Sequence, residues 1–517
     1  MASNINRRKF VGSAVAAGVL TVVPRHVLGG AAFVAPSDKI TLAHVGMGTQ
    51  GFRELRGLLA DPQIQIVAVC DPNADSNDYV EWGKNDIRNT IRALIDKPTW
   101  REGQTGCPGG REVGREVVDA YYANQKGAEK FKACRAYADF RELLEKEKDL
   151  DAVKVMTPDH LHATVCIAAM KKGKHVMVHK PLANRMHEGR LVVETARKTK
   201  VATHLLAYGA GSGNAAIARR IKQGEFGPLR EIHSWTNRPV WPQYTEIPKD
   251  RPPVPKGLDW DLWLGPALDR PYHPHYTHTV FRGWYDFGGG SMADMGIYAL
   301  WPVFAALELG VPQSAEAWAT HTCSIVDHIS RVEKNDFSYP TACSIRFKFA
   351  AQENRPALDL FWYDGGMKPR LPEVVQAMNA AMGIEGILFV GDQWAIMAGF
   401  NGQSPQLFQK GQPVSIVLLE GFTGPIILRG DTSPKGSGRG QKTRGERSSP
   451  WVRAVKGGEP SPGNFLNAAS ITDTVNLGTV ALRAGRKVTF DSQNMKITDP
   501  AGANKFLARE YRKGWEL

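Results

Sequence analysis

The sequence predicts an α/β domain followed by an α+β domain: an N-terminal Rossmann fold with a doubly wound parallel sheet, then a larger domain with a mainly antiparallel open sheet. The chain has 517 residues, and a chain of this length usually has more than a single hydrophobic core. Up to residue 208, short apolar segments alternate with helical patterns, which is typical of a parallel sheet. Beyond it, strand-like segments follow one another with few helices between them, which favours antiparallel pairing.

The elements of the first domain are predicted from apolar runs of strand length and from helical periodicity. We expect strands over 40–45, 64–69, 151–156, 175–178 and 201–206, and helices over 52–59, 163–171 and 187–198. The polar stretch 74–130 is interpreted as an insertion into the Rossmann core, and its pattern indicates no role.

The second domain is predicted to start with a helix over 215–222. Strands are expected over 229–236, 316–323, 342–349, 358–362 and 387–390, and an amphipathic helix over 471–484. The predicted division is a signal peptide over 1–32, a nucleotide-binding domain over 33–208 and a substrate-binding domain over 209–517.

The first residues have the pattern of a twin-arginine export signal. Arg7 and Arg8 precede the apolar run 11–23, and small residues at 29–32 offer a cleavage region. The apolar run is too short for a stable membrane anchor, which needs about 20 residues. We therefore expect an exported, periplasmic protein that uses the twin-arginine machinery. That route carries folded proteins, so a cofactor can be bound before export.

Charge and spacing argue against several other classes. The net charge is +13, but much of the excess lies in the signal and in 429–447, a segment diluted by Gly, Ser and Pro. Aromatic residues are not interleaved there, so no nucleic acid is expected as a partner. No His or Cys pattern has the spacing of a metal site, although His160 and His162 lie close in sequence, so no metal is expected.

A glycine-rich turn follows the first strand. Gly46-Met47-Gly48-Thr49-Gln50-Gly51 is G-x-G-x-x-G, it precedes a helix, and Asp71 ends the next strand. This context predicts a dinucleotide site in which the helix N-terminus holds the pyrophosphate and Asp71 binds the ribose hydroxyls. Because a carboxylate repels a 2′-phosphate, we expect NAD rather than NADP. The alternative is a structural turn with a capping Asp.

Two later strand ends add candidate cofactor-binding residues. In open α/β sheets, ligands lie outside the carboxyl ends of the strands. The residues at these positions are Thr157, Pro158, His162, Lys180 and Pro181. A lone Lys is more often a surface charge, but its place at a strand end favours a role near the cofactor.

The segment 287–298 provides the candidate catalytic pair. It is rich in Gly up to Gly290, and a helix is expected to start near Ser291. Asp294 and Tyr298 are four residues apart and share a helical face. An amphipathic helix with a buried Tyr would have the same spacing.

These motifs together resemble the Gfo/Idh/MocA family of oxidoreductases, over essentially the mature chain. The resemblance implies that Lys180 lies near the nicotinamide, that Tyr298 is the acid/base, and that the protein is a homo-oligomer. Two positions depart from the usual pattern. His179 stands where members usually have Glu before Lys-Pro. Tyr298 stands where many members have His, and this Tyr is similar to the pattern of the glucose-fructose oxidoreductase branch.

The sequence therefore leads us to expect hydride transfer between NAD(P) and a sugar hydroxyl. We expect Tyr298 to take the hydroxyl proton, Lys180 to lower the pKa of Tyr298, and Asp294 to orient the pair. Candidate sugar-binding residues are Tyr208, Asn237, Arg238, Trp241 and Trp284. Each of them could equally be core packing.

Export adds an expectation about the cofactor. No pool of free NAD is expected outside the cytoplasm, so the cofactor should stay bound and be recycled in place. A second substrate can reoxidise it. Alternatively, the hydride is borrowed and returned while a glycosidic bond is eliminated, as in an NAD-dependent glycosidase. A third interpretation is a non-catalytic sugar-binding protein with a vestigial Rossmann domain.

Overall fold

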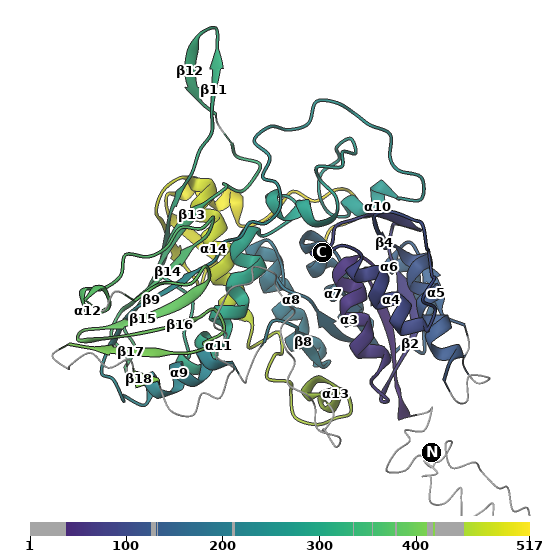
Figure 1. Cartoon of the computed structure of the whole chain (residues 1–517), viewed down its shortest axis with the longest axis horizontal. Coiled ribbons are helices and arrows are strands. Elements are labelled where there is room, and N and C mark those ends of the chain that lie inside the picture. Colours follow the sequence, from purple (N-terminus) through teal and green to yellow (C-terminus); the bar gives the residue numbers. More distant parts are fainter. Residues whose placement is uncertain are drawn as a thin grey trace, which may run out of the picture.

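The computed structural model describes residues 38–125, 131, 133–208, 212–333, 335–353, 355–377, 380–410, 417–418 and 449–517. The predicted export signal at 1–32 and the basic segment 429–447 lie outside the described residues. The described chain builds two sheets, each with its own helices, which stand side by side in Figure 1.

The first sheet has six parallel strands in the order β5-β2-β1-β6-β7-β8. Its strands are β1 (Ile40–Val45), β2 (Ile64–Cys70), β5 (Arg135–Tyr137), β6 (Ala152–Val155), β7 (His175–Val178) and β8 (Thr203–Leu205). Its helices are α3 (Thr49–Leu59), α4 (Asp86–Ile95), α5 (Arg111–Ala123), α6 (Phe140–Lys146), α7 (Asp159–Lys171) and α8 (Met186–Thr199).

Alternation along the strands explains why helices cover both faces of this sheet. Successive strand side chains point to opposite faces. Leu42 packs in one cluster with apolar residues of α3, α4 and α5, whereas Ala43 packs in another with those of α6, α7 and α8. The predicted doubly wound Rossmann sheet is thus confirmed.

The insertion after β2 is folded. It contains the antiparallel pair β3 (Ser76–Tyr79) and β4 (Cys107–Gly109) together with α4 and α5. The sequence indicated no role for this stretch, yet it places Tyr79 beside the glycine turn.

The second sheet has ten strands in the order β18-β17-β16-β15-β9-β14-β13-β10-β19-β20. The pairings are antiparallel except for β9 with β14, so the mainly antiparallel sheet is confirmed. The strands are β9 (Leu229–Trp235), β10 (Ser314–Ala319), β13 (Cys343–Phe349), β14 (Leu358–Tyr363), β15 (Gly386–Gly391), β16 (Trp394–Gly399), β17 (Gln406–Gln409), β18 (Val417–Leu418), β19 (Val488–Asp491) and β20 (Lys496–Asp499).

Helices α9 (Gly213–Lys222), α11 (Ile297–Leu307) and α14 (Ala469–Ala484) pack on the second sheet. Between β9 and α11 the chain leaves the sheet and arches over the Rossmann domain (Figure 1). This arch, residues 236–291, includes α10 (Trp260–Leu264) and the 3₁₀ helix η3 (His278–Gly283). A π-helical turn, η4 (Met292–Gly296), then leads into α11.

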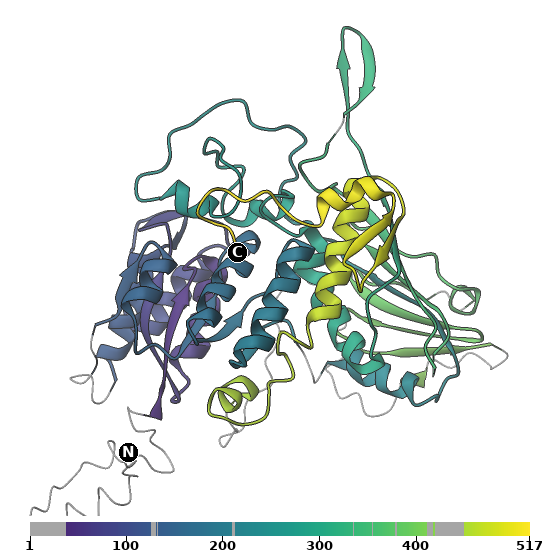
Figure 2. The same cartoon turned by 180° about the vertical axis from the view of Figure 1, so that it is seen from behind.

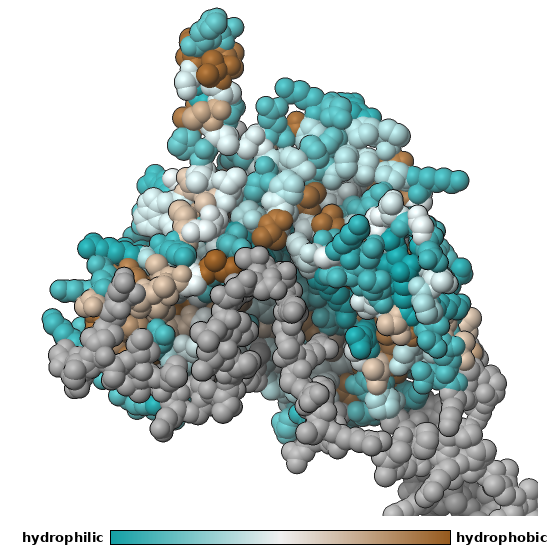
Figure 3. All heavy atoms as spheres, viewed as in Figure 1, coloured by the Kyte–Doolittle hydropathy of each residue, from teal (hydrophilic) through white to brown (hydrophobic). Residues whose placement is uncertain are grey.

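The remaining elements are α12 (Glu373–Gln376), α13 (Pro450–Val455), the 3₁₀ helix η5 (Ala501–Phe506), β11 (Cys323–Val326) and β12 (Ile329–Val332). The last two form a hairpin that projects from the body (Figures 1 and 2). Its apolar residues include Ile325, which is 78% exposed, and they appear brown in Figure 3. No helix in the described part of the chain has the length and apolar character needed to cross a membrane.

The last part of the chain returns to the Rossmann domain, as Figure 2 shows for the yellow segments. Trp451 of α13 is buried in the cluster that contains Phe52 of α3. Near the C-terminus, the Arg141 guanidinium lies over the Trp515 ring, 4.1 Å from its centroid. The two domains are therefore tied together by segments far from residue 208 as well as by the crossing after β8.

Candidate active site

A cavity lies between the carboxyl ends of β1, β6 and β7 and the arch 236–291. Many of the predicted site residues line it: Gly46, Gly48, Gln50, Gly51, Asp71, Thr157, Pro158, Lys180, Arg238, Trp241, Asp294 and Tyr298. The topology thus brings the predicted nucleotide-binding turn and the predicted catalytic residues to one hollow.

The glycine turn is conformationally and sterically demanding. Gly46 has φ +101°, and a Cβ there would lie 2.5 Å from the Met156 carbonyl. A Cβ on Gly51 would lie 2.3 Å from the carbonyl oxygen of Gly46. Both positions therefore require glycine.

Gly48 lies close to a side chain of the insertion. A Cβ on Gly48 would lie 2.9 Å from the ring of Tyr79. The close approach at this glycine is therefore made by the insertion hairpin. No side chain caps the α3 N-terminus that follows, so its amide donors suit an anionic pyrophosphate.

Asp71 lies under the turn. Its Oδ2 accepts the Met47 N–H at 2.7 Å and its Oδ1 accepts the Asn73 N–H at 2.8 Å. Burial raises the pKa of Asp71 to about 6, although these hydrogen bonds and the Arg111 charge oppose the rise. The glycine cradle, the open helix N-terminus and this carboxylate together fit a dinucleotide.

At the other end of the cavity, Asp294 is surrounded by cations. It pairs with the Lys180 ammonium, and the Arg282 and Arg238 Nε atoms lie 3.2 and 3.7 Å from its oxygens. Burial would raise the pKa of Asp294, but Lys180 and the two arginines outweigh it and lower this pKa to about 2. Asp294 is thus a fixed anion that holds Lys180 in the cavity.

Tyr298 has a different partner from the expected one. Its hydroxyl lies 3.2 Å from Nε2 of His179, while the Lys180 Nζ lies 5.4 Å from the centre of its ring. Burial and the Asp294 charge raise the pKa of Tyr298. The expectation that Lys180 lowers this pKa is therefore wrong for this arrangement, because the ammonium is engaged by Asp294.

Three predicted cofactor-binding residues do not line the cavity. Met47 and Pro181 are buried, and the Met47 backbone N–H donates to the Asp71 carboxylate. Both ring nitrogens of His162 face backbone carbonyls, those of Pro181 at 2.6 Å and Thr157 at 2.8 Å. His162 thus joins the two strand-end segments instead of facing the cavity.

Only two of the five predicted sugar-binding residues, Arg238 and Trp241, line the cavity. Trp284 is 1% exposed and donates its indole N–H to the His275 carbonyl at 2.7 Å, so it is a core residue of the arch. The Tyr208 ring packs on Trp301 with centroids 4.9 Å apart. Asn237 does not line the cavity, although the adjacent Arg238 does.

The cavity also has lining residues that the sequence analysis missed, including Tyr79, His179, Trp263, His278, Phe281 and Arg282. The departure of His179 from the family pattern was the one available signal among them. The others come from the insertion and the arch, which have no strand-helix periodicity to place them.

The arch and the segment after β2 form an interdomain clasp, which comprises residues 72–79 and 257–278. The Asp259 N–H donates to the Pro72 carbonyl at 3.0 Å, and the Ala74 N–H donates to the Gly257 carbonyl at 2.9 Å. The rings of Tyr79 and His278 meet with centroids 4.3 Å apart. The clasp crosses the cavity wall beside Asp71.

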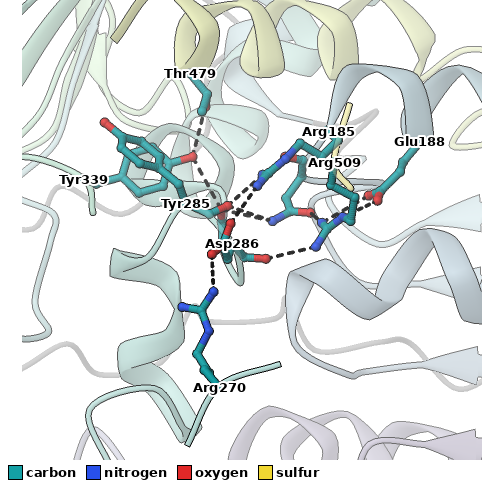
Figure 4. A network of polar contacts seen from close by, with 10 residues as sticks. Arg185, Glu188, Arg270, Tyr285, Asp286, Tyr339, Thr479 and Arg509 are labelled. Carbon is teal, nitrogen blue, oxygen red and sulfur yellow. Dashed lines mark hydrogen bonds and ion pairs between the residues drawn. The ribbon is translucent and has the colours of Figure 1, made fainter. Parts of the chain in front are cut away.

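A network of polar contacts surrounds Tyr285 and Asp286, in the loop before η4 (Figure 4). The Arg185 guanidinium donates to the Tyr285 carbonyl at 2.7 Å, and Arg509 donates to the Asp286 carbonyl at 3.1 Å. Arg509 also pairs with Glu188 of α8 at 2.5 Å. The C-terminal segment therefore fixes the loop before η4 to the Rossmann domain.

Within the described ranges, no three His, Cys, Asp or Glu side chains are grouped so that they could hold a metal ion.

Two family models match the sequence. Residues 104–206 match the NAD-binding Rossmann fold of the GFO_IDH_MocA oxidoreductase family, and residues 229–358 match the family's C-terminal alpha/beta domain. The Bordetella pertussis WlbA dehydrogenase, whose structure is a complex with NADH and UDP-GlcNAcA, shares the fold. Its TM-score is 0.50 at 13% identity, over 88% of this chain and 99% of that one.

Curated relatives match a smaller share of the chain than the WlbA dehydrogenase structure does. A glycosyl hydrolase family 109 protein of Shewanella sp. (strain W3-18-1) is 25% identical over 243 residues, which is 44% of each chain. Levoglucosan dehydrogenase of Pseudarthrobacter phenanthrenivorans is 33% identical over 106 residues, 20% of this chain and 27% of its own. The chain thus spans less than half the length of these relatives. Two segments of the chain thus match the two domain models of the GFO_IDH_MocA oxidoreductase family, and the structure shares the fold of the WlbA dehydrogenase.

Proposed function

We propose that the protein transfers hydride between NAD and a hydroxyl-bearing carbon of a sugar. One observation carries this proposal: a single cavity joins the cradle of Gly46, Gly51 and Asp71 to the group of Lys180 and Tyr298. A nucleotide held by the first set can extend toward the second. A dehydrogenase needs this arrangement.

The proposed chemistry divides between cofactor and chain. When bound, NAD supplies the hydride acceptor. Tyr298 receives the proton of the substrate hydroxyl, since Tyr298 lines the cavity. Lys180 and Arg282 place positive charge where an alkoxide develops, and Asp294 keeps both in position. Arg238 and Trp241 contact the sugar.

The preference for NAD over NADP rests on Asp71. Its carboxylate is buried beside the glycine turn and receives two backbone N–H groups. Near neutral pH, above its pKa of about 6, it is mostly ionised. An anion at this position accepts hydrogen bonds from ribose hydroxyls and repels a 2′-phosphate.

The cofactor is proposed to stay bound and to be recycled in place. Residues 1–32 carry the features of a twin-arginine signal, which leads to a periplasmic protein without a supply of free NAD. The clasp supports retention because it joins the two domains beside the nucleotide cradle. We also propose a homo-oligomer, on the family resemblance alone.

A redox-neutral glycosidase is the second candidate. The glycosyl hydrolase family 109 relatives favour it. The same cavity would serve, because transient oxidation of the sugar uses the same hydride and proton positions. A non-catalytic sugar-binding protein is the third candidate, and it predicts that no nucleotide is held.

The deciding experiment starts with mature protein purified after export and then denatured. We expect one equivalent of NAD(H) in the released material. Stoichiometric NADP would contradict the assignment of Asp71, and no nucleotide, with none taken up on addition, would favour the binding protein. Intact protein is then mixed with D-glucose, D-galactose, myo-inositol and p-nitrophenyl glycosides. A rise in absorbance at 340 nm indicates the oxidoreductase, and p-nitrophenol release without net reduction indicates the glycosidase.

A further inference from the structure

We propose that His179 accepts the phenolic proton of Tyr298, so that the two residues form a proton relay for the substrate hydroxyl. The inference rests on the proposed function and adds a residue to its mechanism. His179 follows the last residue of β7, and Tyr298 lies in the first turn of α11, so each domain contributes one member.

The geometry of the pair is that of a hydrogen bond. The Tyr298 Oη lies 3.2 Å from His179 Nε2, and the two rings meet edge to face with centroids 6.5 Å apart. Both residues line the cavity. A proton that reaches Tyr298 from a sugar hydroxyl can thus be balanced by the departure of the phenolic proton to His179.

The other candidate bases that line the cavity are engaged elsewhere. Asp294 is held by Lys180, Arg282 and Arg238. Asp71 accepts the Met47 N–H in the glycine turn, and His278 packs against Tyr79 in the clasp. Among the described residues, His179 is the imidazole that contacts Tyr298.

The surroundings of His179 favour a neutral ring. Burial, followed by the charges of its neighbours Lys180, His162, Arg282 and Lys154, holds the pKa of His179 well below its usual value. A neutral imidazole has one acceptor nitrogen, and Nε2 faces the Tyr298 hydroxyl. Without such an acceptor, the Tyr298 hydroxyl would stay protonated, because burial and the Asp294 charge raise its pKa.

The proposed step conserves protons and electrons. A bound nicotinamide would accept the hydride of the substrate carbon, while the substrate O–H bond would break and its proton would join Tyr298 Oη. The Tyr298 O–H proton moves to Nε2, which leaves a carbonyl product and an imidazolium. The cations around that imidazolium make it a ready donor, so the proton returns when the hydride is passed on. Such a proton store suits a cofactor that is recycled in place.

The test uses His179→Asn and His179→Gln, which keep polar atoms in the space of the ring but cannot hold the proton. The control is His175→Gln, which changes a half-buried β7 histidine outside the cavity lining. NAD content and circular dichroism verify each fold. Reduction at 340 nm by the active sugar of the panel is then followed from pH 5 to 10.

We expect the rate to fall at least about 100-fold in both His179 variants and to stay within about twofold in the control. Because the pKa of His179 lies well below its usual value, the rate of the unaltered protein should show no acid limb from this histidine within that range, and added imidazole should restore part of the rate in His179→Ala. Unchanged rates in the His179 variants would overturn the relay alone. Failure of the unaltered protein to reduce NAD with any sugar would overturn the proposed function and the relay with it.

Discussion

Tyr79 of the Rossmann insertion meets His278 of the arch with ring centroids 4.3 Å apart, so one aromatic contact joins the two domains beside the glycine turn. The Tyr79 ring also fills the space next to Gly48. A nucleotide bound along the turn would therefore lie against this contact.

Weakening the clasp should speed loss of the cofactor. An aromatic pair contributes about 0.5–1.5 kcal/mol beyond burial, so Tyr79→Ala is expected to raise the dissociation rate of NAD about tenfold or more. Nucleotide retained after timed gel filtration measures this rate. Tyr121→Ala, in α5 of the same insertion and outside the cavity lining, is the matched control. Equal retention in the two variants would show that the clasp does not hold the cofactor.

Asp71→Asn should change which nucleotide binds. The amide removes the charge that opposes a 2′-phosphate, so NADP should bind more tightly relative to NAD. We expect the ratio of the two dissociation constants to shift by about tenfold or more, one charge interaction of about 1.4 kcal/mol. Fluorescence titration with each nucleotide measures it. A ratio that stays the same would place the adenosine ribose away from Asp71.

Without nucleotide, the unaltered protein and Asp71→Asn should also differ in how their free energy of unfolding depends on pH. The folded pKa of Asp71, about 6, lies above its unfolded value of about 3.9. Its contribution to stability is therefore fully present below about pH 4 and is lost as pH rises through 6. The unaltered protein should lose up to about 3 kcal/mol relative to Asp71→Asn over this window. Denaturant unfolding at pH 4, 5, 6 and 7 tests the sign, and a difference that does not vary with pH would contradict it.

The sequence predicted the parts of the fold that local patterns specify. Each strand of the first sheet except β5 was predicted, because buried parallel strands appear as apolar runs between helices. Gly46, Asp71 and Lys180 line one cavity because strand ends of one sheet meet at one edge.

The residues that the sequence could not place depend on long-range packing. Tyr79 of β3 and Arg282 of η3 reach the cavity from short elements whose course is set by contacts between the domains. Trp284 was predicted to bind sugar, yet it is core, since an aromatic residue on an arch can point either way. The pairing of Lys180 with Asp294 depends on how η4 meets the segment after β7, which no spacing reveals.

Asp294→Asn should reduce turnover while leaving the nucleotide in place. The amide keeps the shape but removes the anion shared by Lys180 and Arg282. Because the two cations then repel each other and shift, we expect kcat/KM to fall at least about 100-fold. The NAD content of the purified variant should equal that of the unaltered protein, since Asp71 and the glycine turn are untouched. Lost nucleotide together with lost activity would place Asp294 in cofactor binding instead.

Glu188→Gln should destabilise the fold without touching the cavity lining. The Glu188 and Arg509 side chains are 1% and 5% exposed, and breaking such a buried pair leaves an unpaired guanidinium between the domains. We expect a loss of about 3–5 kcal/mol, seen as a lower thermal midpoint. The control is Glu194→Gln on the same helix, whose pair with Lys198 is solvent-exposed and should leave the thermal midpoint nearly unchanged. If the two variants unfold at the same temperature, the C-terminal segment does not fix the loop before Asp294, and the network of Figure 4 is a consequence of domain packing that does not stabilise it.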